Sequence, residues 1–151
     1  MESNRPQDLA DVFENLVRGQ IELWNAVDAT LQRELDLPVA IHQPLRVIAA
    51  AGEARVGDIA EALVITVGGA SKIVDRLESR GLIERRANPA DRRSSWLALT
   101  DTGIATLTRA DAVVEAELRE LLLQPLGAER VAALGEALVI LRTTITREDH
   151  S

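Results

Sequence analysis

The fold is decided by the stretch Arg55–Thr100, RVGDIAEALVITVGGASKIVDRLESRGLIERRANPADRRSSWLALT. Apolar residues recur at helical spacing over Val56–Leu63 and Thr66–Arg80. Two short β-type runs follow, Leu82–Ala87 and Ser95–Leu99, on either side of a polar turn. This order of segments predicts a helix-turn-helix followed by a two-stranded wing.

The helix expected over Thr66–Arg80 has two unlike faces. At about 100° per residue, its apolar side chains gather on one side, and its small, hydroxyl and charged residues on the other. A polar face of that kind suits a recognition helix, which enters the major groove of DNA. The apolar side is formed by Ala70, Ile73, Val74 and Leu77, and the polar side by Gly68, Lys72, Asp75 and Ser79, with Ser71 and Arg76 at its flanks.

Helix-ending signals bound both helices of this pair. Asp58 falls in the first turn of the earlier helix, where a carboxylate suits the unpaired N–H groups and the helix dipole. Thr66 is an N-cap residue for the second helix, and Gly81 stands where a C′ glycine is expected. These signals predict where each helix begins and where the second one ends.

The turn between the two β-type runs is polar and charged. It reads Asn88-Pro89-Ala90-Asp91-Arg92-Arg93, and Asn followed by Pro starts a turn. An arginine on a thin, exposed hairpin can enter a narrow minor groove, where the potential is most negative. Asp91 is close enough in sequence to hold one of the two guanidinium groups in position.

Segment by segment, the chain resembles a MarR-type winged-helix transcriptional regulator. Three motifs carry the resemblance: DIAEAL at 58–63, SKIVDRLESRGLIERR at 71–86 and NPADRRSSWLALTDTG at 88–103. The last is the most specific, because D-x-R in the wing followed by L-T-x-x-G is rare outside that family. The order and lengths of the segments match over almost the whole chain, whereas the specific motifs lie between Asp58 and Gly103.

The resemblance implies an all-α fold with a small β-wing and with long terminal helices that interlock two subunits into a homodimer. It implies that double-stranded DNA is the partner, that Arg93 enters the minor groove and that Arg92 contacts a phosphate. The chain departs from the family at Val64, where glycine is frequent, and at Gly68–Gly69, where Ser or Thr usually supplies base contacts. The expected DNA-binding residues are Thr66, Gly68, Gly69, Ser71, Lys72, Arg76, Asp91, Arg92 and Arg93.

In relatives, small anionic aromatic molecules bind between the dimer helices and the DNA-reading unit, and they change the spacing of the recognition helices. Trp24, His42 and Arg46 are the candidates for such an effector site. His42 has a plainer interpretation as a polar residue at the start of a helix. Repression by blocking a promoter is the commoner mode in the family. A winged-helix protein-interaction module without DNA binding is the alternative function.

Several residues of the polar face also have a plain interpretation. Lys72 and Arg76 can be solvated side chains that are balanced by Asp75 and Glu78 at helical spacing. We favour DNA contact for Lys72, whereas an internal ion pair is an equally good role for Arg76. The Gly68–Gly69 pair either allows the helix backbone to approach DNA closely or lets another helix pack tightly.

The distribution of charge matters more than the net charge of −7, which at first argues against nucleic acid. Between Arg55 and Trp96, eight basic and six acidic residues give a net charge of +2. The remainder holds nine basic and eighteen acidic residues, a net charge of −9. Phosphate binding depends on the local patch, so the winged region remains compatible with DNA, and acidic surroundings are expected to keep non-specific binding weak.

The composition excludes several other classes of protein. Cysteine is absent, which excludes disulfides, Cys-based zinc sites and thiol redox sensing. No apolar run approaches the roughly 18 residues of a membrane span, and the N-terminus is unlike a signal peptide, so we expect a cytoplasmic protein. We find no Walker-type phosphate loop, no histidine pair at metal-ligand spacing and no nucleophile elbow, so we expect neither enzyme activity nor a metal or cofactor.

Long apolar-periodic segments flank the winged region. The first of them, 8–35, has a stripe too long to be buried on a small winged domain, so a second copy of the chain is its expected cover. Further helices are expected over 41–51, with Pro44 in the first turn, and over 101–123 and 128–147. We expect one domain over 1–151, in which 8–36 and 101–147 are dimerisation helices and 40–100 is the winged helix-turn-helix.

Overall fold

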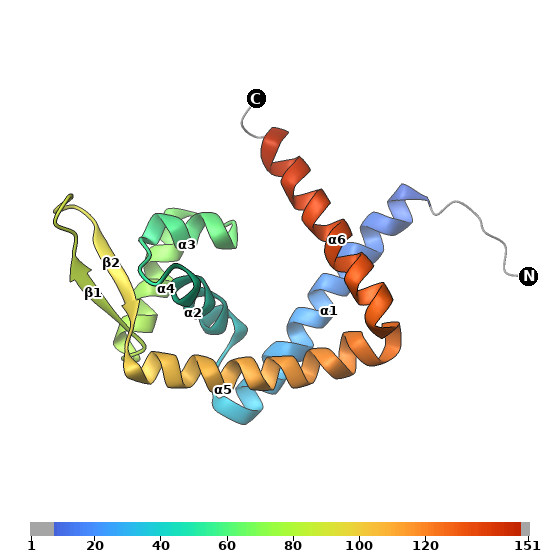
Figure 1. Cartoon of the computed structure of the whole chain (residues 1–151), viewed down its shortest axis with the longest axis horizontal. Helices are drawn as coiled ribbons and strands as arrows, with labels where there is room; N and C mark the ends of the chain where they lie inside the picture. Colours follow the sequence, from blue (N-terminus) through green and yellow to red (C-terminus); the bar gives the residue numbers. More distant parts are fainter. Residues whose placement is uncertain (1–7, 149–151) are drawn as a thin grey trace, which may run out of the picture. The chain divides into compact units, whose positions relative to one another are not determined.

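The structure is a computed structural model that describes residues 8–148, which form two compact units, one ending at Val114 and the other beginning at Glu115. The expected helical body with a two-stranded wing is confirmed (Figure 1). In chain order the elements are α1 (Leu9–Leu35), α2 (Val39–Ala51), α3 (Val56–Leu63), α4 (Val67–Ser79), β1 (Ile83–Ala87), β2 (Ser95–Leu99), α5 (Asp101–Leu118), the π-helical turn η1 (Arg119–Leu123) and α6 (Gln124–Glu148).

The core of the first unit lies among α2, α3 and α4, with contributions from the end of α1 and from β2. It is almost entirely aliphatic, as the aromatic content of 2% requires. Apolar residues that recur at i, i+4 and i+7 turn one face of α4 toward this core and leave the other face outside. Residues fully buried in it include Leu31, Leu45, Ile48, Ile59, Ala70, Val74, Leu77 and Leu97.

The wing is a two-stranded antiparallel hairpin that is anchored at its base. Ile83 pairs with Leu99 and Ala87 with Ser95. Ile83 and Leu97 are buried, and an isolated bridge from Leu97 to Ala54 ties β2 to the loop before α3. The hairpin therefore rests on the helices at one end, and its tip projects at the other (Figure 1).

α2 begins at Val39, two residues earlier than expected, with Pro38 as its N-cap. Pro44 therefore lies inside the helix, and its expected place in the first turn was wrong. A proline at this position cannot donate to the carbonyl of Ala40, four residues earlier. Ala40 is exposed, so water can satisfy that carbonyl while the ring of Pro44 packs in the core.

The predicted helix ends are confirmed. The backbone N–H of Arg55 donates to the carboxylate of Asp58 at 2.7 Å, which satisfies the start of α3. The N–H of Gly69 donates to the hydroxyl of Thr66 at 3.1 Å, so Thr66 caps α4. Gly81 follows α4 with a φ of +69°, the left-handed conformation that a C′ glycine adopts without strain.

The turn between α3 and α4 places a valine in the left-handed region. Val64 has a φ of 54° and a ψ of 48°, and its side chain is 89% exposed. The N–H of Ile65 donates to the carbonyl of Ala60 at 3.0 Å, which closes the turn. A β-branched residue is strained in this conformation, so the turn forms at an energetic cost that glycine would avoid.

The L-T-x-x-G motif fixes the start of α5 to the turn between α4 and β1. The hydroxyl of Thr100 accepts from the N–H of Gly103 at 3.0 Å and donates to the carbonyl of Gly81 at 2.6 Å. A Cβ at Gly103 would lie 1.9 Å from the carbonyl oxygen of Leu82. Only glycine fits there without a shift of the backbone, which gives this motif a structural reason.

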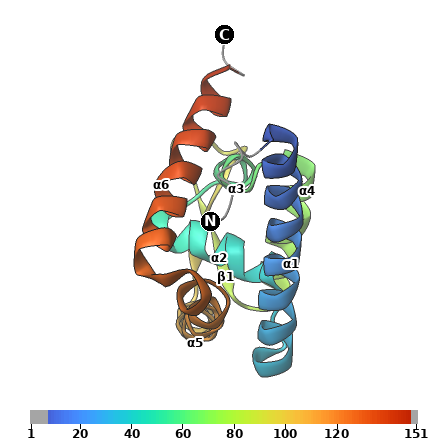
Figure 2. The same ribbon diagram turned by 90° about the vertical axis from the view of Figure 1, so that its right-hand side faces the viewer.

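Most of α1 is exposed although its apolar stripe is continuous. Only Val27, Thr30 and Leu31 of this helix are buried. The helix runs without interruption (Figure 2), so the exposed part of the stripe is a single surface. Its exposed apolar residues are Leu9, Val12, Phe13, Leu16, Val17, Ile21 and Trp24.

The second unit contains the end of α5, the turn η1 and the helix α6. The α-helix expected to continue to residue 123 gives way to a π-helical turn at Arg119. The expected break falls at Gly127, which has a φ of 78° and a ψ of 160°. None of the described helices is long and apolar enough to cross a membrane. Exposed apolar residues of α6 include Leu134, Leu138, Val139, Ile140, Leu141 and Ile145.

Candidate nucleic-acid interface

The two faces predicted for α4 are present in the structure. Ala70, Val74 and Leu77 are buried against the first unit. The opposite side of the helix is exposed to solvent and carries short or charged groups. After Val67, the first residue of the helix, it carries no large apolar side chain. Thr66, Gly68, Lys72, Asp75, Arg76 and Ser79 are exposed, and Gly69 and Ser71 are half-buried.

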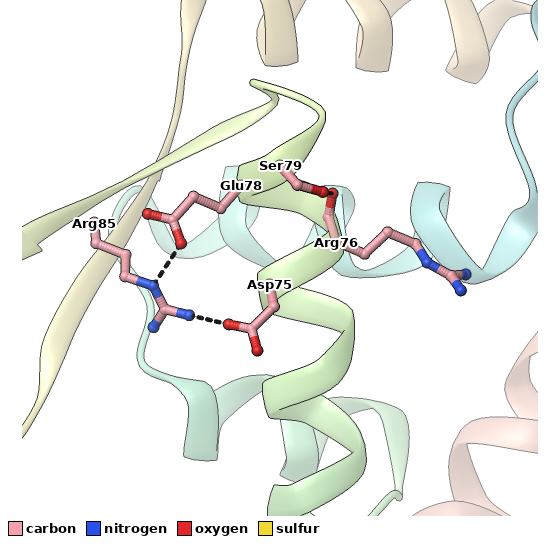
Figure 3. Close-up of polar contacts among 5 residues, drawn as sticks. All are labelled: Asp75, Arg76, Glu78, Ser79 and Arg85. Atoms are coloured by element: carbon pink, nitrogen blue, oxygen red, sulfur yellow. Dashed lines mark hydrogen bonds and ion pairs between the residues drawn. The ribbon is translucent and has the colours of Figure 1, made fainter.

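Arg85 on β1 forms ion pairs with both carboxylates of α4. Its Nη2 lies 2.7 Å from the Asp75 carboxylate, and its Nε lies 2.9 Å from the Glu78 carboxylate (Figure 3). The side chain of Arg76 points away from this group in the same view, and the hydroxyl of Ser79 donates to its backbone carbonyl (Figure 3). The internal ion pair considered for Arg76 is therefore absent from the described part of the chain.

The eight basic side chains of the winged region divide into two equal groups. Arg55, Arg80, Arg85 and Arg86 each have a protein partner: a carboxylate for three of them and the Asp36 carbonyl for Arg80. Within residues 8–148, no ion pair or side-chain hydrogen bond engages the other four. Those four unpaired cations are Lys72, Arg76, Arg92 and Arg93, on the outer face of α4 and at the wing tip.

Arg86 is an example of a basic side chain in this region that is already paired with carboxylates. It lies 2.6 Å from the carboxylate of Glu84 and 3.2 Å from that of Glu53. The hydrogen bond and the negative charge of Glu84 raise the pKa of Arg86 above its ordinary value. The guanidinium is therefore charged at every accessible pH but is already neutralised by its neighbours.

The wing tip is held by side chains that bond to its own backbone. Asn88, which is buried, accepts from the N–H of Ala90 at 3.0 Å and donates to the hydroxyl of Ser94 at 2.9 Å. The carboxylate of Asp91 accepts from the backbone N–H of Arg93 at 2.9 Å. The expectation that Asp91 holds a guanidinium was wrong, because its carboxylate bonds to the backbone of Arg93 and, within residues 8–148, to no guanidinium. Asp91 shapes the loop and leaves the arginine side chains extended into solvent.

Gly68 and Gly69 differ in what surrounds them. A Cβ at Gly68 would meet nothing within 4 Å, whereas one at Gly69 would lie 3.2 Å from the capping hydroxyl of Thr66. Tight packing of another helix, considered as the plain reason for this pair, is absent at Gly68 within the described chain. The bare backbone at the start of α4 instead faces open space.

A cleft beside the wing brings three arginines to the N-terminus of a helix. Its volume is about 340 Å³. The guanidinium of Arg55 also lies over the ring of Trp96, 5.3 Å from its centroid, which holds it in place. Two of the three arginines are already paired, Arg55 with Asp58 and Arg85 with Asp75 and Glu78. The cleft is lined by Arg55, Val56, Gly57, Asp58, Arg85, Arg93, Ser94 and Ser95.

His42 and Arg46, two of the three candidates for an effector site, meet at Asp111 of α5. The Nε2 of His42 lies 2.8 Å from an Asp111 carboxylate oxygen, and the Nε of Arg46 lies 4.0 Å from the same oxygen. His42 is the fourth residue of α2, as its interpretation as a polar residue at a helix start predicts; it is fully buried, and its Nδ1 has no hydrogen-bond partner within residues 8–148. Trp24 is 41% exposed, and no described hydrogen bond or ion pair joins it to this group.

Sequence reasoning missed three residues that organise these sites. Arg85 and Asp111 are paired with groups 10 and 69 residues away in the chain, which no local spacing reveals. Arg55 is the first residue of the stretch that predicts the winged region. Its position over the ring of Trp96 depends on how β2 returns to α3, which the sequence does not reveal. Arg85 lies two residues after the buried Ile83 and therefore on the same face of β1, which was the one available signal that it turns toward the helices.

The fold and the exposed cationic surface define a winged helix-turn-helix protein of the DNA-binding class. Residues 35–94 match the model of the MarR family. A proposed transcriptional regulatory protein for the hcr operon of Thauera aromatica is 28% identical over 121 residues, which are 80% of this chain and 73% of that protein. The chain thus shares its sequence pattern with bacterial regulators over most of its length.

Solved structures of protein–DNA complexes share the fold. A MarR family transcriptional regulator from Streptomyces coelicolor in complex with DNA has a TM-score of 0.80 at 25% identity, covering 94% of this chain and 91% of that chain. The transcriptional repressor CouR bound to a 23-mer DNA duplex has a TM-score of 0.79 at 29% identity, covering 91% and 99%. The chain thus matches the MarR family model over residues 35–94 and shares the fold of solved transcriptional regulators of that family.

Proposed function

We propose that this regulator is a homodimeric, ligand-responsive repressor that binds a pseudo-palindromic operator. The observation that carries the proposal is the division of the cations in the winged region. Internal carboxylates and a carbonyl engage four of them, and the four left unpaired, Lys72, Arg76, Arg92 and Arg93, lie on the outer face of α4 and at the wing tip. Unpaired cations gain most from phosphates, because they lose no internal partner on binding.

Each unpaired group receives a role from its place in the fold. Lys72 faces outward from the middle of α4 and contacts a base edge in the major groove. Gly68 allows the helix backbone to approach the DNA closely. Arg93 enters the minor groove, and Arg92 contacts a phosphate.

The homodimer is supported by the exposed apolar stripe of α1 and by the similar surface of α6. Monomeric soluble proteins rarely expose apolar patches of this extent. A second copy of the chain covers both surfaces and presents two recognition helices. A pseudo-palindromic operator follows, with half-sites about 34 Å apart along one face of the duplex.

The effector site is supported by the buried group around Asp111. A buried ring nitrogen without a partner costs free energy, and the Nδ1 of His42 is such an atom. Arg46 lies beside it with an exposed guanidinium. A small anionic aromatic molecule would supply a partner for both residues, and Trp24 is the third candidate. Binding there would change the spacing of the two recognition helices and release the promoter that the dimer blocks.

Salt dependence of DNA binding tests the proposal. Affinity for the DNA upstream of the protein's own gene is measured by fluorescence anisotropy at several salt concentrations, for the wild type, Arg93→Ala and Arg86→Ala. Each lost phosphate contact reduces the slope of log K against log salt by about 0.9. We expect Arg93→Ala to weaken binding at every sequence and to flatten the slope. Arg86→Ala is the matched control, because Glu84 and Glu53 already engage its guanidinium.

Two outcomes contradict parts of the proposal. Absence of salt-dependent binding to any duplex favours the alternative, a winged-helix module that binds protein. A monomeric mass by light scattering at micromolar concentration contradicts the homodimer. The effector is tested separately by thermal shift with a panel of phenolic acids, since a ligand that binds only the folded state raises its stability. A regulator that ignores such ligands shows no shift with any of them.

A further inference from the structure

The first turn of α4 offers methyl groups where a helix that reads bases by hydrogen bonds would offer polar ones. Val67 is the first residue of the helix, and its side chain is 61% exposed. The turn before it exposes Val64 and Ile65 by 89% and 38%. Gly68 and Gly69, the next two residues, have no side chains. Val67 is therefore the most prominent side chain at the end of the helix that enters a groove first.

The hydrogen-bonding groups of this turn are already partly engaged. The hydroxyl of Thr66 accepts from the N–H of Gly69 at 3.1 Å, which closes the cap of the helix. The first polar side chain that follows Val67 on the same row of the helix is Ser71, one turn later. It is half-buried. The chemistry presented by the first turn is thus apolar, and burial of this surface on binding is favourable only against an apolar group.

We propose that Val67 reads the 5-methyl group of thymine in the major groove. The inference rests on the DNA-binding function proposed above and adds which base the first turn recognises. The N-terminal residues of a recognition helix contact base edges. Among the base edges of the major groove, thymine alone presents a methyl group. The open space over Gly68 lets the backbone come close enough for a side chain as short as valine to reach that methyl.

The expected effect is modest for one contact and larger for the dimer. Covering one methyl group corresponds to about a fourfold gain in affinity. A homodimer that reads one thymine in each half-site applies this gain twice, so the loss of both methyl groups weakens binding roughly fifteenfold. A change of that size is well resolved by equilibrium titration.

Deoxyuridine tests the inference directly, because it differs from thymidine only by the missing methyl group. Binding sites are selected from random duplexes with the full-length protein. Each thymine of the selected half-site is then replaced by deoxyuridine symmetrically, and the Kd is measured by fluorescence anisotropy. We expect one thymine position whose replacement weakens binding of the wild type roughly fifteenfold, while replacement at the other positions changes the Kd less than twofold.

The Val67→Ala variant assigns the effect to its residue. Its ratio of deoxyuridine to thymine Kd should fall close to one, whereas Lys72→Ala, the matched control on the same helix, should bind more weakly but keep the wild-type ratio. Circular dichroism verifies the fold of each variant. The deoxyuridine series on the wild type tests the inference even if a variant fails to fold. The inference is overturned if every replacement changes the wild-type Kd less than twofold, or if Val67→Ala keeps the full ratio. Failure to select any DNA contradicts the proposed function instead.

Discussion

The guanidinium of Arg85 lies 2.7 Å from the carboxylate of Asp75 and joins the wing to the recognition helix (Figure 3). The same group also binds Glu78 at 2.9 Å. The one positive charge of Arg85 is thereby shared by two carboxylates of α4 and offsets one of their two negative charges. The arrangement leaves Lys72 and Arg76 free to meet phosphates and bases, and it couples the position of the wing to that of α4.

Loss of Arg85 should weaken DNA binding by exposing two carboxylates to the phosphate backbone. We expect Arg85→Gln to lower operator affinity about tenfold or more through like-charge repulsion. Adding Asp75→Asn and Glu78→Gln to this variant should restore most of the affinity, because the repulsion is then gone. Anisotropy titrations of the single and triple variants measure both effects. A triple variant that stays as weak as the single one would show that Arg85 itself contacts DNA.

Gly68→Ala should raise stability and lower DNA affinity together. A Cβ there meets nothing in the chain, and alanine in a helix is favoured over glycine by up to about 1 kcal/mol. The same Cβ would hold the helix backbone away from the DNA. Urea denaturation and operator titration on one protein preparation measure the two quantities. Unchanged affinity would contradict close backbone approach at this position.

Val64→Gly should stabilise the protein, since it removes a β-branched residue from a left-handed conformation. The gain in the free energy of unfolding should be about 1 kcal/mol. Ala62→Gly, at an exposed helical position of α3, is the control and should cost about 0.5–1 kcal/mol. Chemical denaturation of both variants decides the sign. Destabilisation by Val64→Gly would mean that the exposed valine makes contacts that outweigh its strain.

Gly103→Ala should destabilise the protein, because the new Cβ would overlap the carbonyl oxygen of Leu82 at 1.9 Å. The free energy of unfolding should fall by about 1–3 kcal/mol as the backbone adjusts. Gly19→Ala is the control in open helical space and should be neutral or stabilising. Thermal melts monitored by circular dichroism compare the two. Equal stability of the Gly103 variant and the wild type would refute the close contact.

The pair formed by His42 and Asp111 should show coupling in a double-mutant cycle. Asp111→Ala leaves both ring nitrogens of the buried His42 without a protein partner, which should cost about 1–3 kcal/mol of stability. His42→Leu in that background should recover part of the loss, because the unpaired polar atoms are removed. Urea denaturation of the four proteins gives the coupling energy. Additive effects of the two substitutions would rule out the interaction.

Much of the winged region could be predicted from the sequence because its signals are local. The Thr66 cap, the Gly81 turn and the alternation of core and surface on α4 depend on residues within one or two helical turns of each other. The start of α2 was misplaced for a related reason. Local rules exclude proline from a helix interior, but burial of Pro44 in the core outweighs the hydrogen bond that it removes.

The sequence by itself determined the order of the elements, the two faces of the recognition helix and the cationic composition of the wing. Only the tertiary structure decided which cations are available for DNA, because that depends on where β1 lies beside α4 and brings Arg85 to Asp75 and Glu78. It likewise brought His42 to Asp111 across 69 residues. Hydrogen bonds and ion pairs form between groups that are close in space, and spacing along the chain predicts that closeness only within a helix or a turn.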